Sequence, residues 1–272
     1  MIVIGEKING TRKEVGQAIP ARDEKKIQAL ARMQVDAGCN FLDVNVGMPP
    51  DREPVDMVWL VKTIQAVCEI PLCLDSANPE ALRAGLEQIH APAMINSVSG
   101  EQSRIDGILP LACEFKTELI LLPLDEAGIP KTSDGRMAIV EKLVRLAKAG
   151  GLSEDQLYID PLATAIGTGT DAAMVTFDTI GKIRKVFPGA HVTIGLSNIS
   201  FGMPLRSLIN QAFLSMAVLS GLDSAIMNPN DRQLKGTMLA AEMLSNKDRY
   251  CQKFSRAYRS GKIGSEIIAK TQ

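Results

Sequence analysis

Carboxylate and amide side chains recur at the ends of short apolar runs along this 272-residue chain. The runs are FLDVN (Asp43, Asn45), LCLDS (Asp75), AMINS (Asn96), LLPLD (Asp125), YIDP (Asp160), IGLSN (Asn198) and AIMNP (Asn228). They follow one another at an average of about 31 residues, close to the length of one βα unit. A repeat of that kind brings the polar side chains to the same end of a parallel sheet, so we expect a shared site there.

Three of these polar residues together favour a flat ligand that is rich in N–H donors. Asp75 and Asp160 carry carboxylates that can each accept from two neighbouring N–H groups, and Asn96 carries both a donor and an acceptor. Such a set would suit a 2-amino-4-oxo pterin ring. Each residue also has a purely structural interpretation, as a helix cap for Asp75 and as a turn or loop residue for the other two.

A second group of residues lies around the predicted last strands. Asn198 follows Gly195, whose lack of a side chain would let a ring lie close to the backbone. Arg206 is the cation nearest to this segment in the sequence. The structural alternatives are a cap or turn for Asn198 and a solvated helix charge for Arg206.

The first strands offer further candidates for supporting roles. Glu6 ends the first apolar run, and Asp43 with Asn45 ends the second. These residues either contact a ligand directly or orient nearby loops through turns and ion pairs. Asp125 and Asn228 share the strand-end pattern, but the sequence assigns them no role.

Other kinds of site are poorly supported. The chain has only two histidines, His90 and His191, and no GxGxxG, Walker A or GxSxG motif at a strand end. A bare metal site would require more carboxylates or histidines than the strand ends supply. We therefore expect no intrinsic metal and no histidine-based catalysis.

Composition narrows the class of protein further. The net charge is −1 and aromatic residues make up 4% of the chain, so neither nucleic acid nor an anionic membrane is an expected partner. No apolar run reaches the roughly 18 residues of a membrane span. Five cysteines without a CxxC pair favour a reducing cytoplasm over a disulfide framework.

Strands alternating with helices predict an α/β chain that folds as one (β/α)8 TIM barrel over residues 1–272. The strand-like runs are mostly continuous apolar segments, which is typical of a parallel sheet covered by helices. The predicted strands are 2–8, 41–46, 71–76, 93–98, 119–124, 157–161, 191–197 and 224–227. The predicted helices are 23–37, 53–67, one starting after Asn78, 133–149, 171–186, 205–220 and 233–244. The tail after about residue 246 is expected to be peripheral, with a final helix that frays.

Several of these motifs are specific in combination. The segments GEKING, LDVNVG, LCLDSAN, AMINS, YIDP and GLSNIS follow one another from Ile2 onward, and the similarity extends to about Phe254. In this order the chain resembles the methyltetrahydrofolate:corrinoid protein methyltransferases. That family includes the acetogen enzyme that serves a corrinoid iron–sulfur protein and the folate domain of cobalamin-dependent methionine synthase.

The resemblance implies a function and residue roles. Asp75, Asn96 and Asp160 would hold the pterin, and Asn198 would lie near N5 of tetrahydrofolate. The reaction would move a methyl group between that N5 and the cobalt of a corrinoid (cobalamin), with either tetrahydrofolate or 5-methyltetrahydrofolate as the substrate, in a direction that the sequence leaves open. Because the chain lacks an Asp-x-His-x-x-Gly motif, we expect the corrinoid on a separate corrinoid-binding protein, and the family implies a homodimer.

Two alternatives stay open at this stage. One is a pterin-condensing enzyme like dihydropteroate synthase, although the Ser-x-Arg-Pro-Gly segment and the lysine of that family are not evident. The other is a non-catalytic folate-binding barrel. The segment 201–204 reads Phe-Gly-Met-Pro where the acetogen enzyme is polar, which leaves the identity of the partner protein open.

Overall fold

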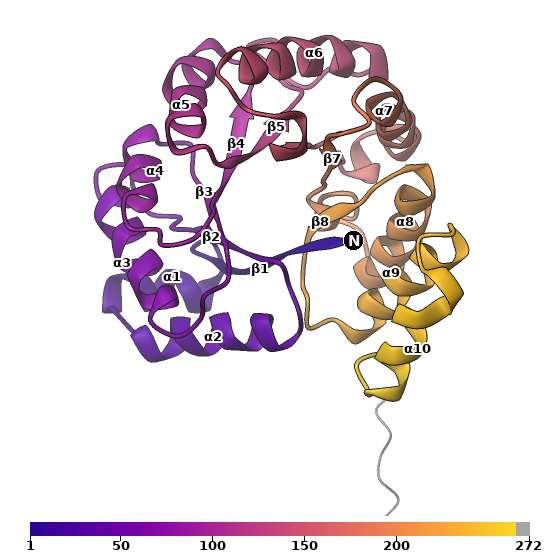
Figure 1. Cartoon of the computed structure of the whole chain (residues 1–272), viewed down its shortest axis with the longest axis horizontal. Helices are drawn as coiled ribbons and strands as arrows, with labels where there is room; N and C mark the ends of the chain where they lie inside the picture. Colours follow the sequence, from indigo (N-terminus) through magenta and orange to yellow (C-terminus); the bar gives the residue numbers. More distant parts are fainter. Residues whose placement is uncertain (265–272) are drawn as a thin grey trace, which may run out of the picture.

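Eight parallel strands stand inside a ring of helices in the computed structural model, which describes residues 1–264 (Figure 1). The strands are hydrogen-bonded in the order β7-β6-β5-β4-β3-β2-β1-β8. They span β1 (Ile2–Asn9), β2 (Phe41–Asn45), β3 (Leu72–Asp75), β4 (Met94–Ser99), β5 (Glu118–Leu122), β6 (Leu157–Ile159), β7 (His191–Val192) and β8 (Ser224–Met227). The predicted (β/α)8 fold is thereby confirmed.

The barrel closes between its last two strands through a few contacts. The backbone N–H of Ile226 donates to the carbonyl of Ile194 at 2.9 Å, and Gly195 forms an isolated parallel bridge with Ile226. The predicted strand 191–197 is therefore too long, because regular pairing ends at Val192. After Gly195 the chain turns into a short 3-10 helix, η3 (Leu196–Asn198).

The helices begin where capping chemistry predicts. Asp23 accepts from the N–H of Lys26 at the start of α2, and Asn78 accepts from the N–H of Glu80 at the start of α4. The helices are α1 (Lys13–Ala21), α2 (Glu24–Asp36), α3 (Glu53–Gln65), α4 (Pro79–Leu86), α5 (Gln102–Phe115), α6 (Ser133–Ala149), α7 (Ala172–Val186), α8 (Arg206–Ser220), α9 (Arg232–Leu244) and α10 (Gln252–Arg259).

Sequence analysis missed α1 and α5. Each contains an internal proline, which removes a backbone donor and normally argues against a helix.

Side chains alternate along the strands between two apolar regions. One large cluster fills the space between strands and helices. A second, small cluster fills the barrel interior with one side chain from each of six strands, namely Ile4, Phe41, Cys73, Met94, Ile120 and Tyr158. Because side chains repeat every two residues on a strand, the residues two positions further along also point into the barrel. This step places Glu6, Asp43, Asp75, Asn96 and Asp160 directly above the apolar layer.

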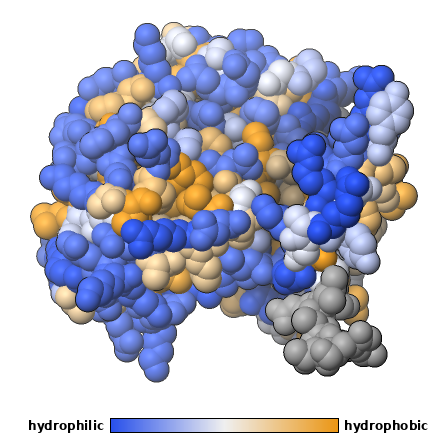
Figure 2. All heavy atoms as spheres, turned by 60° about the horizontal axis from the view of Figure 1, so that its bottom comes forward, coloured by the Kyte–Doolittle hydropathy of each residue, from blue (hydrophilic) through white to orange (hydrophobic). Residues whose placement is uncertain are grey.

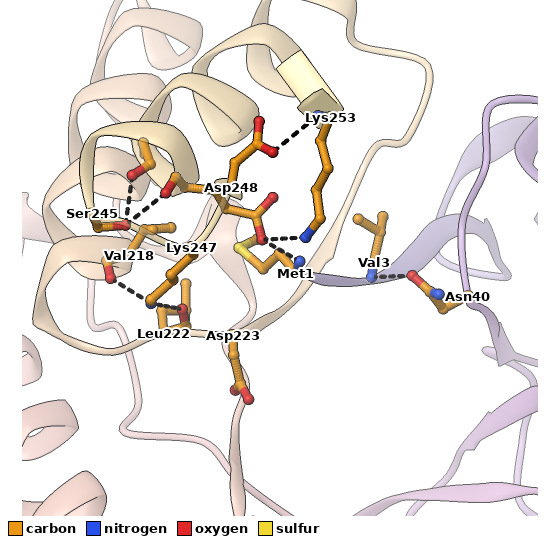
Figure 3. A network of polar contacts seen from close by, with 12 residues as sticks. Met1, Val3, Asn40, Val218, Leu222, Asp223, Ser245, Lys247, Asp248 and Lys253 are labelled. Atoms are coloured by element: carbon orange, nitrogen blue, oxygen red, sulfur yellow. Dashed lines mark hydrogen bonds and ion pairs between the residues drawn. The ribbon is translucent and has the colours of Figure 1, made fainter. Parts of the chain in front are cut away.

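At the amino-terminal ends of the strands, the start of the chain contacts α9, which also contacts the segment that follows it. The ammonium group of Met1 pairs with Glu242 of α9, and Lys253 lies 3.8 Å from the same carboxylate (Figure 3). Lys247 donates to the carbonyls of Val218 and Leu222 at 2.9 and 3.3 Å. These contacts fix the segment after residue 246 against the barrel, where α10 packs on α9. The expected fraying would fall after that helix, and residues 265–272 lie outside the described residues.

Hydrophilic residues dominate the face of the molecule shown in Figure 2, and hydrophobic residues gather mainly near its middle. Within residues 1–264, none of the helices combines the length and the apolar character that crossing a membrane requires.

Candidate functional site

A cavity of about 500 Å³ opens at the carboxyl ends of the strands. This is the end of a (β/α)8 barrel where loops and strand ends combine into active sites. Most of the residues predicted from sequence line the cavity: Glu6, Asp43, Asp75, Asn96, Gly195, Asn198 and Arg206. Asn45 and Asp160 do not belong to its lining.

Two amides hold two carboxyl groups on one side of the cavity. The Nδ2 of Asn96 donates to Oδ1 of Asp43 at 3.2 Å, and the Nδ2 of Asn45 donates to Oδ2 of Asp75 at 3.0 Å. The strand register explains the second contact, since Asp75 lies opposite Asn45 on β2, and it places Asn96 of β4 on the other side of Asp75. Asn45 thus orients Asp75 from outside the cavity lining.

Burial controls the charge of these carboxyl groups. It raises the pKa of Asp75 to about 6, against the lowering effect of the hydrogen bond from Asn45. Asp43 is 3% exposed, and burial together with the nearby Asp75 raises its pKa well above the usual value. The two neighbouring carboxyl groups therefore hold a proton more readily than an exposed aspartate, and the ionised form of Asp75 accepts hydrogen bonds from N–H donors.

Asp160 is buried and does not line the cavity. Its Oδ1 accepts from the N–H of Leu162 at 2.7 Å, and burial raises its pKa to about 6. The guanidinium of Arg136, which sequence analysis did not identify, donates to the carbonyls of Pro161 and Leu162 at 2.6 and 2.7 Å. In this structure Asp160 shapes the loop after β6.

Asn198 lies in η3 on the other side of the mouth. A side chain at position 195 would place its Cβ 2.9 Å from Nδ2 of Asn198, so glycine leaves room for this amide. Arg206 braces the same segment by donating from Nη2 to the carbonyl of Ser197 at 2.7 Å and from Nε to Oγ of Ser200 at 3.1 Å. The arginine therefore positions Asn198 from the start of α8.

The cavity has further lining residues beyond those discussed so far. Asn9, Arg12 and Asn210 line the cavity, and so does Asn228, for which the sequence assigned no role. Sequence analysis missed Arg12 and Asn210, because one precedes a helix and the other lies inside a helix, where no strand-end pattern marks them. Asp125 instead closes a turn by accepting from the N–H of Ala127 at 2.9 Å, away from the cavity.

Buried polar atoms without partners show where a ligand would complete the site. Oδ1 of Asn210 and Nε of Arg12, from two residues that line the cavity, are buried and find no hydrogen-bond partner among residues 1–264. Leaving such atoms unpaired costs free energy that a polar ligand would recover. No three histidine, cysteine or acidic side chains in this part of the chain are grouped to hold a metal ion. The donors and acceptors instead suit a planar heterocycle.

Comparison with known proteins agrees with that chemistry. Residues 5–228 match a family described as pterin binding enzymes. The chain is 39% identical to a methylcorrinoid:tetrahydrofolate methyltransferase from Eubacterium limosum, over 97% of this chain and 98% of that protein. It is 32% identical to the methionine synthase of Mycobacterium tuberculosis over 84% of this chain, which spans only 20% of that longer protein.

Solved structures show the same architecture. A dihydropteroate synthase from Xanthomonas albilineans, solved with 4-aminobenzoic acid, superposes with a TM-score of 0.67 at 19% identity and covers 92% of this chain and 93% of its own. The Coxiella burnetii dihydropteroate synthase with pteroic acid gives 0.66 at 16% identity, covering 91% and 94%. At these identities the likeness concerns the fold.

Proposed function

Because the chain belongs to the pterin-binding enzyme family, we propose that it is a methyltransferase that moves a methyl group between a corrinoid and N5 of tetrahydrofolate. Near full-length similarity to a methylcorrinoid:tetrahydrofolate methyltransferase supports the direction from corrinoid to tetrahydrofolate. The similarity to methionine synthases, which covers most of this chain, supports the same substrate pair.

One structural observation carries the proposal. Asp75 of β3 and Asn96 of β4 line one cavity together with Asn198, which lies in the segment after β7. Asp75 would accept from the 2-amino group and a neighbouring ring N–H of the pterin, while Asn96 would pair with a ring nitrogen or oxygen. Asp160 would support the pterin from beneath. That arrangement would leave N5, on the opposite edge of the ring system, facing Asn198.

The residues then act on a developing charge. The methylated corrinoid would be the methyl donor: the N5 lone pair would form the new N–C bond, and the electron pair of the broken cobalt–carbon bond would stay on cobalt as cobalt(I). N5 becomes positive and must lose its proton. The Asn198 carbonyl would accept a hydrogen bond from N5–H that strengthens as this charge grows, and a water relay to Asp75 or Asp43 would carry the proton away.

A separate protein would deliver the corrinoid to the open mouth of the barrel. Phe201 and Leu205, in the loop that follows Asn198, are 72% and 77% exposed and form an apolar rim there. An exposed apolar rim beside a reaction site is typical of a docking surface. The proposal includes a homodimer and a cytoplasmic location, as the family resemblance and the cysteine usage suggest.

An anaerobic spectrophotometric assay tests this function. The purified protein is mixed with methylcobalamin and tetrahydrofolate, and the appearance of cob(I)alamin is followed; the reverse mixture is cob(I)alamin with 5-methyltetrahydrofolate. We expect protein-dependent transfer in both mixtures. Consumption of a pterin pyrophosphate with 4-aminobenzoate and Mg²⁺, without methyl transfer, would instead indicate a dihydropteroate-synthase-like enzyme. Tight folate binding without transfer from free or protein-bound corrinoid would indicate a binding protein.

A further inference from the structure

We propose that Arg12 binds the glutamate tail of the folate substrate, an inference that rests on the function proposed above. Arg12 lies in the loop after β1, directly before α1, and lines the cavity. Tetrahydrofolate carries its pterin at one end and glutamate carboxylates at the other. A substrate whose ring lies by Asp75 and Asn96 needs a second subsite for that anionic end.

The side chain of Arg12 is placed for an external anion. Its Nε is buried, yet it finds no hydrogen-bond partner among the described residues. Within residues 1–264 the guanidinium also has no carboxylate within the 4.0 Å of an ion pair. A partly buried guanidinium without a partner is costly, and a carboxylate is the group that its planar donors fit best.

Nearby carboxylates of the protein are engaged elsewhere. Glu14, two residues along, pairs with Lys26 at 3.1 Å. Asp231, which also lines the cavity, caps α9 by accepting from the N–H of Leu234 at 2.9 Å. Burial raises the pKa of the Glu6 carboxyl group, an effect that the charges of Lys7 and Arg12 oppose without an ion pair between Glu6 and Arg12. The positive charge of Arg12 therefore remains available.

Arg12 also stands where the cavity meets the surface. It lines both the mouth cavity and a shallow hollow of about 480 Å³, which it shares with Lys13, Glu14 and Gln17 in the first half of α1. A tail that leaves the cavity past Arg12 would enter this hollow. Exposed Lys13 and the N-terminal end of the α1 dipole add positive potential there. The same path would accommodate further glutamates of a polyglutamate tail.

Binding measurements without any corrinoid test this inference. Calorimetry under anaerobic conditions compares tetrahydrofolate with tetrahydropteroate, which lacks the glutamate. We expect wild-type protein to prefer tetrahydrofolate by roughly fivefold to thirtyfold, the effect of about one charge-assisted hydrogen-bonded pair. Arg12→Gln should reduce this preference to less than about twofold, and Arg12→Lys should restore part of it because the charge returns.

A matched control is Arg145→Gln, an exposed arginine of α6 that should leave the preference unchanged. Circular dichroism melting verifies that each variant folds. Equal affinity of the wild type for both ligands, or an undiminished preference in Arg12→Gln, would overturn the inference. A preserved preference in a protein that transfers no methyl group would leave this inference standing and overturn the proposed function instead.

Discussion

Individual carboxyl groups at the barrel mouth are buried, and a buried carboxylate is less stable than one exposed to water. Asp75 has a pKa of about 6, against an ordinary value of 3.8, because it is buried. The free protein therefore holds this carboxylate at a cost, and a ligand with N–H donors recovers it. A residue that is costly for stability and suited to a ligand is typical of a functional site.

Replacement of Asp75 by asparagine tests this trade-off. The raised pKa means that the folded state binds the proton more tightly than the unfolded state. The stabilising effect of protonation is complete below pH 3.8 and is lost as the pH rises through about 6. At pH 7.5 we expect Asp75→Asn to raise the free energy of unfolding by about 1 to 3 kcal/mol in urea titrations.

The same variant should weaken tetrahydrofolate binding by at least about tenfold, because the amide brings its own donors toward those of the pterin. Wild-type affinity should fall as the pH drops through about 6, since the protonated acid no longer accepts two hydrogen bonds. A variant that is destabilised at pH 7.5 yet binds tetrahydrofolate normally would show that Asp75 has a structural role instead.

Asn198 should matter for the rate far more than for binding. We expect Asn198→Ala to lower the turnover of methyl transfer by roughly 100-fold, because the hydrogen bond to N5 strengthens only as charge develops. The dissociation constant of tetrahydrofolate should change by less than about fivefold. Asn230→Ala, in the loop after β8, is the control. Unchanged turnover in Asn198→Ala would remove this amide from the mechanism.

At the scale of elements, the two-residue repeat along each strand places the polar site residues directly above an apolar layer inside the barrel. Ile120, fully buried on β5, belongs to the apolar layer beneath the site, and truncation of such a side chain leaves a cavity. We expect Ile120→Ala to lower the free energy of unfolding by about 3 kcal/mol in urea titrations. The control Ile129→Ala, at a side chain that is 44% exposed, should cost far less. Equal losses in the two variants would contradict the role of the interior layer.

The turn that carries Asn198 depends on a second element, the start of α8. Arg206 holds the carbonyl of Ser197 and the hydroxyl of Ser200, so its loss should free the turn. We expect Arg206→Gln to lower turnover by roughly tenfold while melting within a few degrees of wild type, and Arg206→Lys to recover part of the rate. A lower melting temperature with normal turnover per folded molecule would contradict this positioning role.

Strand positions were predictable from sequence because each strand carries its own apolar run and polar end. Asp43, Asp75 and Asn96 reach the cavity for that reason. The roles of Asn210 and Arg12 arise only when α8 and the β1 loop meet at the mouth, which no local pattern encodes. Asp160 shared the strand-end signal but is buried outside the cavity lining, where its carboxylate accepts from the N–H of Leu162 in the loop after β6.

At the scale of the whole molecule, the two ends of the barrel have different tasks. One end holds ion pairs and backbone contacts that join Met1 to α9 and α10, which is a stabilising arrangement (Figure 3). At the other end, buried carboxyl groups have raised pKa values and buried polar atoms lack hydrogen-bond partners among the described residues. The apolar side chains of Phe201 and Leu205 are exposed there. We therefore expect the folate to enter the cavity first and the corrinoid protein to cover the mouth afterwards.

Tracking the methyl group itself tests the central claim most directly. Methylcobalamin labelled with ¹³C in its methyl group is incubated anaerobically with tetrahydrofolate and the protein, and ¹³C NMR follows the label. We expect the label to appear on N5 of tetrahydrofolate with wild-type protein, and roughly 100-fold more slowly with Asn198→Ala. A label that stays on cobalt with wild-type protein, even when the corrinoid is presented on a carrier protein, would contradict the proposed methyl transfer.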